Sequence, residues 1–188
     1  MKLPEFFDSV PPLLLRDPLA DLLGAAEAGV IEYRYADAVK LAGHSCPSVA
    51  GAWLMAKHGL AALYPEALPQ RGNIRVEMSG PADAGVTGVV ATVLGLITGA
   101  AGENGFKGLG GKQSRRGLLN FGLEMNVVAR MTRLDSGAAV DLNYKPELAP
   151  ASAEMAPLMA RVVGDTADDA ERRAFAGLWQ DRVRRILL

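Results

Sequence analysis

The longest apolar stretch of the chain, residues 85–99, limits its fold more than any other feature. Its large side chains recur at the three- and four-residue intervals of a helix, at Val86, Val89, Val90, Val93 and Ile97. The stretch is shorter than the roughly 20 residues that a helix needs to cross a bilayer. A helix that is apolar on most sides has to be buried among other elements. The sequence therefore predicts a globular protein with this helix in its core.

Chain length and composition favour a single domain. The chain has 188 residues, 49% of them hydrophobic, and domains of this size bury about 70% of their unfolded surface. We expect an N-terminal arm over residues 1–36, a core over 37–145 and a C-terminal helical region over 146–188. The three parts together form the one predicted domain.

Periodicity and turn signals predict alternating helices and strands. Besides the helix over 86–97, helices are expected at 18–23, 37–41 and 47–64 and near the C-terminus, with Asp83 and Asp165 or Thr166 as N-caps. Strands are expected at 30–35, 74–78, 118–121, 127–134 and 138–144, the last two joined by a turn at 135–137. This order predicts an α+β fold: a small mixed β-sheet with helices packed on it and a C-terminal amphipathic helix.

Charge and cysteine content exclude several function classes. The formal net charge is −1 and the charges are interspersed, which argues against nucleic acid or an anionic membrane as partner. Arg182, Arg184 and Arg185 are expected to neutralise the dipole of a C-terminal helix. The N-terminal residues do not have the pattern of a signal peptide, and a single cysteine excludes an internal disulfide. We therefore expect a cytoplasmic protein.

The segment over residues 43–47 is the strongest candidate for chemistry. Cys46 precedes Pro47 at the start of a predicted helix, where free N–H groups and the helix dipole favour a thiolate. Such a thiolate is a nucleophile and a metal ligand, so Cys46 is the candidate catalytic residue and His44 with Cys46 the candidate metal ligands. His58 lies about 18 Å along the helix and cannot join them. The alternative is that Cys46 is only a buried apolar residue.

A glycine-rich segment over residues 99–117 is a second candidate region. Dense glycines let backbone N–H groups approach an anion, and lysines add positive charge. The candidate ligand-binding or cofactor-binding residues are Gly102, Gly105, Lys107, Gly110, Gly111 and Lys112. The segment matches neither a P-loop nor a dinucleotide fingerprint. The alternative is a flexible connection between a helix and the sheet.

Residues 38–52, Ala-Val-Lys-Leu-Ala-Gly-His-Ser-Cys-Pro-Ser-Val-Ala-Gly-Ala, resemble the His-x-Cys-Pro segment of the formylmethanofuran dehydrogenase E-like family. The resemblance covers about residues 36–122. It implies that His44 and Cys46 bind zinc or another divalent transition metal, on a small α+β domain that forms homodimers. The chain departs from the family pattern where Ala42 replaces the first histidine and where the later cysteines and the C-terminal zinc ribbon are missing.

Three functions remain open from the sequence. The first is a metal-binding protein, with zinc the expected metal, that binds or acts on a small-molecule ligand near His44 and Cys46, as a homodimer. The second is a metal-free thiol enzyme or redox sensor that uses Cys46 as nucleophile and His44 as base. The third is a non-catalytic ligand-binding or accessory subunit in which Cys46 is only packed.

Overall fold

The computed structural model describes residues 2–188 and confirms the α+β fold. Its helices are α1 (Pro18–Leu22), α2 (Tyr35–Ala42), α3 (Pro47–Leu63), α4 (Thr87–Thr98), α5 (Met155–Val163) and α6 (Asp169–Leu187). Its strands are β1 (Leu13–Arg16), β2 (Val30–Tyr33), β3 (Ile74–Met78), β4 (Leu119–Asn120), β5 (Ala129–Arg133) and β6 (Ala139–Leu142). Short 3-10 turns occupy Glu5–Ser9, Glu27–Gly29 and Pro146–Leu148.

The main sheet has four strands in the order β4-β3-β5-β6 and is mixed. Strand β3 runs parallel to β4 and antiparallel to β5, with Val76 opposite Leu119 on one side and Met131 on the other. The β5–β6 hairpin turns at Gly137, whose positive φ of 72° suits glycine. The alternation along β3 buries Ile74, Val76 and Met78 completely and leaves the charged residues between them on the outer face.

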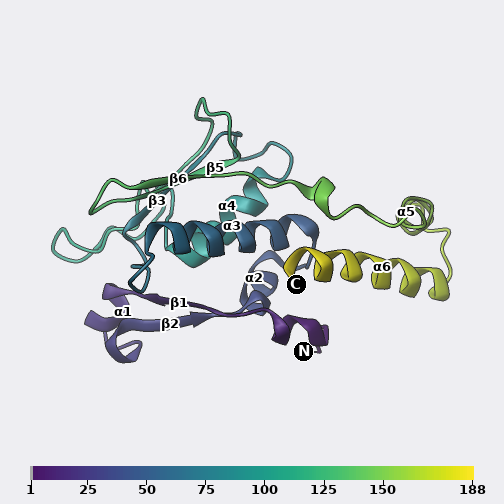
Figure 1. Ribbon diagram of the computed structural model, residues 1–188, viewed down its shortest axis with the longest axis horizontal. Helices are drawn as coiled ribbons and strands as arrows, with labels where there is room; N and C mark the ends of the chain where they lie inside the picture. Colours follow the sequence, from purple (N-terminus) through teal and green to yellow (C-terminus); the bar gives the residue numbers. More distant parts are fainter. Residues whose placement is uncertain (1) are drawn as a thin grey trace.

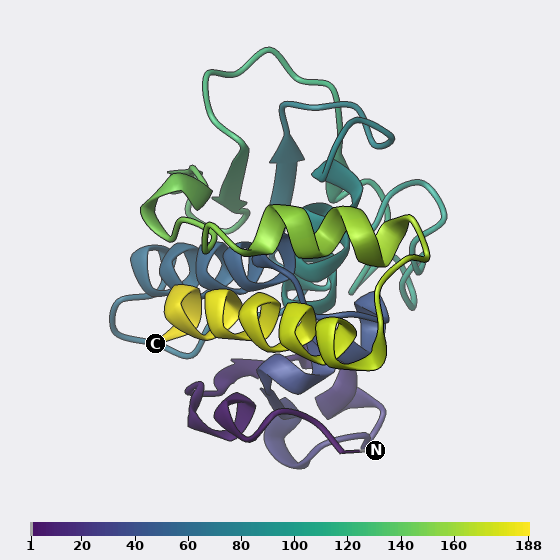
Figure 2. The same cartoon turned by 90° about the vertical axis from the view of Figure 1, so that its right-hand side faces the viewer.

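Helices α3 and α4 form a central layer. One side of this layer contacts strands of the four-stranded sheet, and the antiparallel β1–β2 ribbon lies on the other side, together with α1 (Figure 1). Helix α6 runs along α3, and α5 packs beside α6 (Figure 2). An aromatic row of Phe7, Tyr35 and Trp53 passes through the core, with ring centroids 4.9 and 6.0 Å apart. It joins the N-terminal segment to α2 and α3.

Helix α4 is the buried helix that the apolar stretch predicts. It runs over 12 residues, and Val90, Val93, Leu94 and Ile97 are almost completely buried. Its close neighbour is α3, on which Val49, Trp53, Ala56 and Leu60 recur at helical intervals and are buried as well. None of the helices between Lys2 and Leu188 combines the length and apolar character of a membrane-spanning segment.

Three details differ from the sequence-based expectations. Asp83 is not the N-cap of α4, because the chain makes an exposed turn over residues 82–86 before the helix begins at Thr87. Helix α6 is capped by Asp168 rather than Asp165 or Thr166, since Asp168 forms a reciprocal capping box with Glu171. Strand β1 was not expected, because its hydrogen-bonding partners lie beyond α1, in β2.

Candidate functional site

Cys46 is the N-cap of α3, as the sequence predicts. Its extended backbone leads into Pro47 at the first helical position, and its Sγ accepts a hydrogen bond of 3.4 Å from the Val49 backbone N–H. Gly43, with φ of 75°, ends α2 and turns the chain into this loop. The Cys46 side chain is held at the helix N-terminus, and the residue keeps 8% of its surface exposed. The sulfur therefore has one fixed donor and limited access to solvent.

The loop before Cys46 is fixed by side chains from the preceding helix α2 and from the distant helix α6. The Ser45 carbonyl accepts hydrogen bonds from Trp179 Nε1 at 2.9 Å and Gln180 Nε2 at 3.2 Å, both on α6. The Ser45 hydroxyl lies 3.0 Å from the Tyr35 hydroxyl on α2. Three hydrogen bonds on one residue restrict the backbone next to Cys46. The position of the sulfur is consequently set before any ligand arrives.

Two tyrosine hydroxyls lie near this cysteine. Burial raises the pKa of Tyr35 far above its ordinary value, and the hydrogen bond to Ser45 opposes this only in part. Burial likewise raises the pKa of Tyr144, against the charge of Arg182. Both hydroxyls therefore stay protonated near neutral pH. The Tyr144 hydroxyl is buried and has no hydrogen-bonding partner in residues 2–188.

Tyr144 owes its position to a glycine in α3. The Tyr144 ring lies so close to Gly51 that a Cβ at this position would overlap the ring. The absence of a side chain at Gly51 thus makes room for an aromatic ring. The ring separates two pockets, because Tyr144 lines both.

His44 is exposed and is not paired with the thiol. Its Nδ1 lies 2.9 Å from the Ala42 carbonyl oxygen, which makes Nδ1 the protonated nitrogen and leaves the Nε2 lone pair free. Among residues 2–188 no hydrogen bond joins His44 to Cys46, so this structure does not contain the thiol–imidazole pair of a thiol enzyme. His58 is exposed on α3 and lines a different pocket.

The donors near Cys46 do not complete a metal site within one chain. Over residues 2–188, no three side chains of the types His, Cys, Asp and Glu are grouped closely enough to hold a metal ion. A structural zinc site needs four such donors and a catalytic one needs three. His44 and Cys46 supply two, so the described residues of a single chain complete neither kind of site.

A pocket of about 690 Å³ opens at the N-terminal ends of α3 and α4, with His44 and Cys46 in its wall; we call it the Cys46 pocket. Much of its wall is apolar and comes from Pro47, Val86, Val90, Val128, Pro146 and Trp179. Its remaining polar groups are Ser48, Tyr144 and Arg182. The pocket thus combines an apolar wall with a thiol and one permanent positive charge.

The glycine-rich segment forms no part of this wall. It begins at Gly99, at the C-terminal end of α4, whereas the pocket lies at the N-terminal end, about 18 Å away along a 12-residue helix. The structure therefore brings His44 and Cys46 together but places the six candidate residues of the loop elsewhere. These are Gly102, Gly105, Lys107, Gly110, Gly111 and Lys112.

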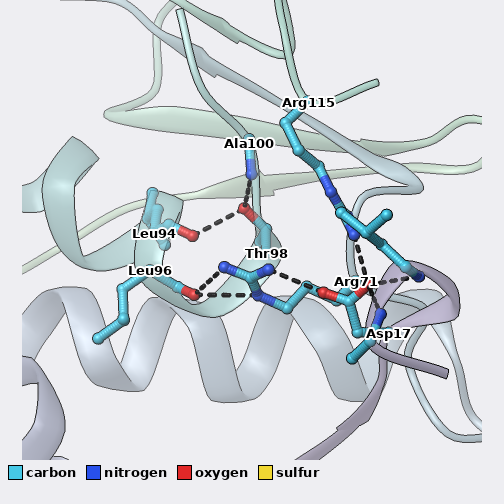
Figure 3. Close-up of polar contacts among 9 residues, drawn as sticks. Asp17, Arg71, Leu94, Leu96, Thr98, Ala100 and Arg115 are labelled. Carbon is cyan, nitrogen blue, oxygen red and sulfur yellow. Dashed lines mark hydrogen bonds and ion pairs between the residues drawn. The ribbon is translucent and has the colours of Figure 1, made fainter. Parts of the chain in front are cut away.

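The glycine-rich segment is instead anchored by a buried ion cluster (Figure 3). Arg115 donates to one oxygen of Asp17 at 2.5 Å, and Arg71 donates to the other at 2.8 Å. Arg71 also donates to the Leu96 carbonyl at the end of α4. Arg115 is 5% exposed and Asp17 3%. The cluster ties the segment to the N-terminal arm, so its arginines have a structural partner.

Sequence reasoning missed the residues that complete the Cys46 pocket. Arg182 was expected to neutralise a helix end, yet it points to the segment after β6 and donates to two of its carbonyls. Tyr144 was expected only as the last residue of the strand predicted at 138–144. No local signal marks either residue, because each joins the pocket through contacts made far from its own position in the chain.

No family model, no curated protein and no solved structure matches this chain.

Proposed function

We propose that this protein binds a small, mainly apolar molecule in the Cys46 pocket, with the Cys46 thiol in contact with the ligand. The observation that carries the proposal is the pocket itself. Its volume of about 690 Å³ lies within the roughly 300–1,000 Å³ of small-molecule sites, which are largely apolar with a few convergent polar groups. The thiol is one of those groups.

The wall of the pocket supports the proposal because it is rigid before binding. The Ser45 carbonyl is held by Trp179 and Gln180, and the Tyr144 ring is seated on Gly51. A site whose walls are already ordered loses little conformational entropy when a ligand enters. The pocket therefore favours a ligand that fits a fixed shape.

A bound ligand should protect Cys46 from alkylation. Cys46 is the single cysteine of the chain, so the rate of N-ethylmaleimide addition reports on this pocket alone. With octanamide as a neutral probe at ten times its Kd, the rate should fall about tenfold. Mass spectrometry of the alkylated protein over time measures the rate, and Cys46→Ser should take up no label.

Two matched variants test whether protection arises in the pocket. Val86 is 51% exposed and lines the Cys46 pocket, whereas Leu134 is 43% exposed and lies at the β5–β6 turn, outside it. Val86→Trp should fill the pocket and abolish protection, and Leu134→Trp should leave protection unchanged. If neither octanamide nor octanoate slows alkylation of the wild type, the proposed function is wrong.

A second candidate function is a metal-binding protein with a site shared between two copies. One observation favours it: the bond between His44 Nδ1 and the Ala42 carbonyl is the arrangement that orients a ligating histidine through Nε2. The resemblance of residues 38–52 to the formylmethanofuran dehydrogenase E-like family points the same way. Since two donors are insufficient, the remaining donors would come from a second copy, a ligand or solvent.

This candidate predicts that zinc content and dimerisation are lost together. Wild-type protein should hold near-stoichiometric zinc and run as a homodimer, and both properties should disappear in His44→Ala and in Cys46→Ser. His58→Ala, which changes an exposed histidine outside the pocket, is the matched control and should keep both. Elemental analysis with multi-angle light scattering measures them. A wild-type protein that takes up no zinc after reconstitution rules this candidate out.

A further inference from the structure

Arg182 is a fixed cation without an acidic partner in the wall of the Cys46 pocket. Its Nε donates to the Ala149 carbonyl at 2.7 Å and its Nη2 to the Pro146 carbonyl at 3.1 Å. Its Nη1 has no acceptor in residues 2–188, and none of their carboxylates is within ion-pairing distance of the guanidinium. The neighbouring Arg184 and Arg185 both pair with Asp181. Arg182 is thus held in place by neutral groups that leave its charge uncompensated.

The surroundings of Arg182 are free of acidic side chains on the pocket side. No aspartate or glutamate lines the Cys46 pocket between residues 2 and 188. The same holds for the second pocket, of about 360 Å³, on the other side of Tyr144, which has His58, Lys145 and Arg185 in its wall. Glu147 acts on Tyr144 from nearby, but its side chain is exposed and forms no ion pair within the described chain. The local field therefore favours an anion.

We infer that the Cys46 pocket selects small carboxylates with an apolar body, and that the carboxylate binds to the free Nη1 of Arg182. This inference rests on the proposed function and names its ligand class. The apolar wall of Val86, Val90 and Trp179 accommodates the body of the ligand. One guanidinium supplies a single positive charge, which balances the single negative charge of a carboxylate and leaves half the charge of a dianionic phosphate without a partner.

Two probes that have nearly the same shape but differ in charge test whether the pocket prefers carboxylates. Octanoate should bind wild-type protein at least about tenfold more tightly than octanamide, because a hydrogen bond to a charged group contributes a factor of about ten to a hundred. Raising the salt concentration should weaken the binding of octanoate and leave the binding of octanamide nearly unchanged. Isothermal titration calorimetry measures both affinities, and protection of Cys46 from N-ethylmaleimide shows that each probe occupies this pocket.

Variants of two neighbouring arginines identify the cation. Arg182→Gln should remove most of the preference for octanoate, because it should weaken the binding of octanoate by a much larger factor than the binding of octanamide. Arg184→Gln, on the same helix turn but paired with Asp181, should retain the full preference. Since Arg182 also supports residues 146–149, thermal unfolding is compared for both variants, and Arg182→Lys, which keeps the charge, should retain part of the preference.

The outcomes separate this inference from the proposed function. If octanamide binds wild-type protein as tightly as octanoate and protects Cys46, the pocket binds small molecules but the carboxylate class is wrong. A preference that survives in Arg182→Gln also overturns the inference, because another group then recognises the anion. If neither probe binds or protects the thiol, the proposed function fails and the inference fails with it.

Discussion

Replacing Asp17 with Asn should lower the free energy of unfolding by about 3–5 kcal/mol, because it leaves two guanidinium groups without their shared carboxylate. Asp17 and Arg115 are both buried, and Arg71 is only partly accessible. Two cations close together in a poorly hydrated place are much more costly than the same pair around an anion. Equilibrium unfolding in urea measures the loss.

Asp21→Asn is the matched control for this prediction. Asp21 lies on the same helix, α1, and pairs with Arg16 in an exposed ion pair of 2.8 Å. Exposed pairs of this kind contribute about 0–1 kcal/mol. If Asp17→Asn is no more destabilising than Asp21→Asn, the buried cluster does not contribute to stability as we describe.

The cluster also predicts how stability depends on pH. Burial alone would raise the pKa of Asp17, but the hydrogen bond from Arg71 and the charge of Arg115 outweigh it and hold the pKa below its ordinary 3.8. A carboxyl group with a depressed pKa stabilises the fold above its unfolded pKa and loses this contribution as the pH falls through its folded pKa. The difference in stability between wild type and Asp17→Asn should therefore be full above about pH 4 and shrink on further acidification.

Trp53→Ala should cost about 3–5 kcal/mol of unfolding free energy, the usual loss for a buried aromatic residue. Trp53 has no exposed surface and contacts the Tyr35 ring edge-on. Trp53→Phe should cost less than Trp53→Ala, because it keeps an aromatic ring in the core and removes an indole N–H that is buried without an acceptor in residues 2–188. Urea unfolding of both variants tests this. A loss in Trp53→Phe as large as that in Trp53→Ala would contradict this prediction.

Much of the secondary structure could be predicted from the sequence, because it depends on local patterns. Helices α3 and α4 carry a clear helical period, β3 alternates between buried and exposed residues, and the β5–β6 turn has glycine at a positive φ. Strand β1 could not be predicted, since four residues after two prolines become a strand only when β2 returns to pair with them. The N-cap of α6 was predicted wrongly, because Asp165 and Asp168 both carry the carboxylate of a typical N-cap and lie only three residues apart.

Only those features of the candidate site that depend on residues close together in the sequence could be predicted. The placement of Cys46 at a helix N-terminus follows from Pro47, and the structure confirms it. The wall of the pocket comes from five separate parts of the chain. The periodicity of apolar residues in the sequence does not predict which of these parts lie together in the fold. The glycine-rich segment was a candidate for binding an anion, but its Arg115 instead pairs with Asp17, 98 residues earlier, and no signal in the sequence indicates this contact.

The hydrogen bonds from α6 to the Ser45 carbonyl span 134 and 135 residues, and this has a consequence for biosynthesis. During synthesis α2, α3 and the strands of the four-stranded sheet emerge from the ribosome before Trp179 and Gln180 are made. Until they arrive, the backbone before Cys46 is unsupported and the thiol faces the surroundings without its aromatic cover. Oxidants and electrophiles should therefore modify Cys46 faster in nascent chains that end before Trp179 than in chains in which α6 is in place.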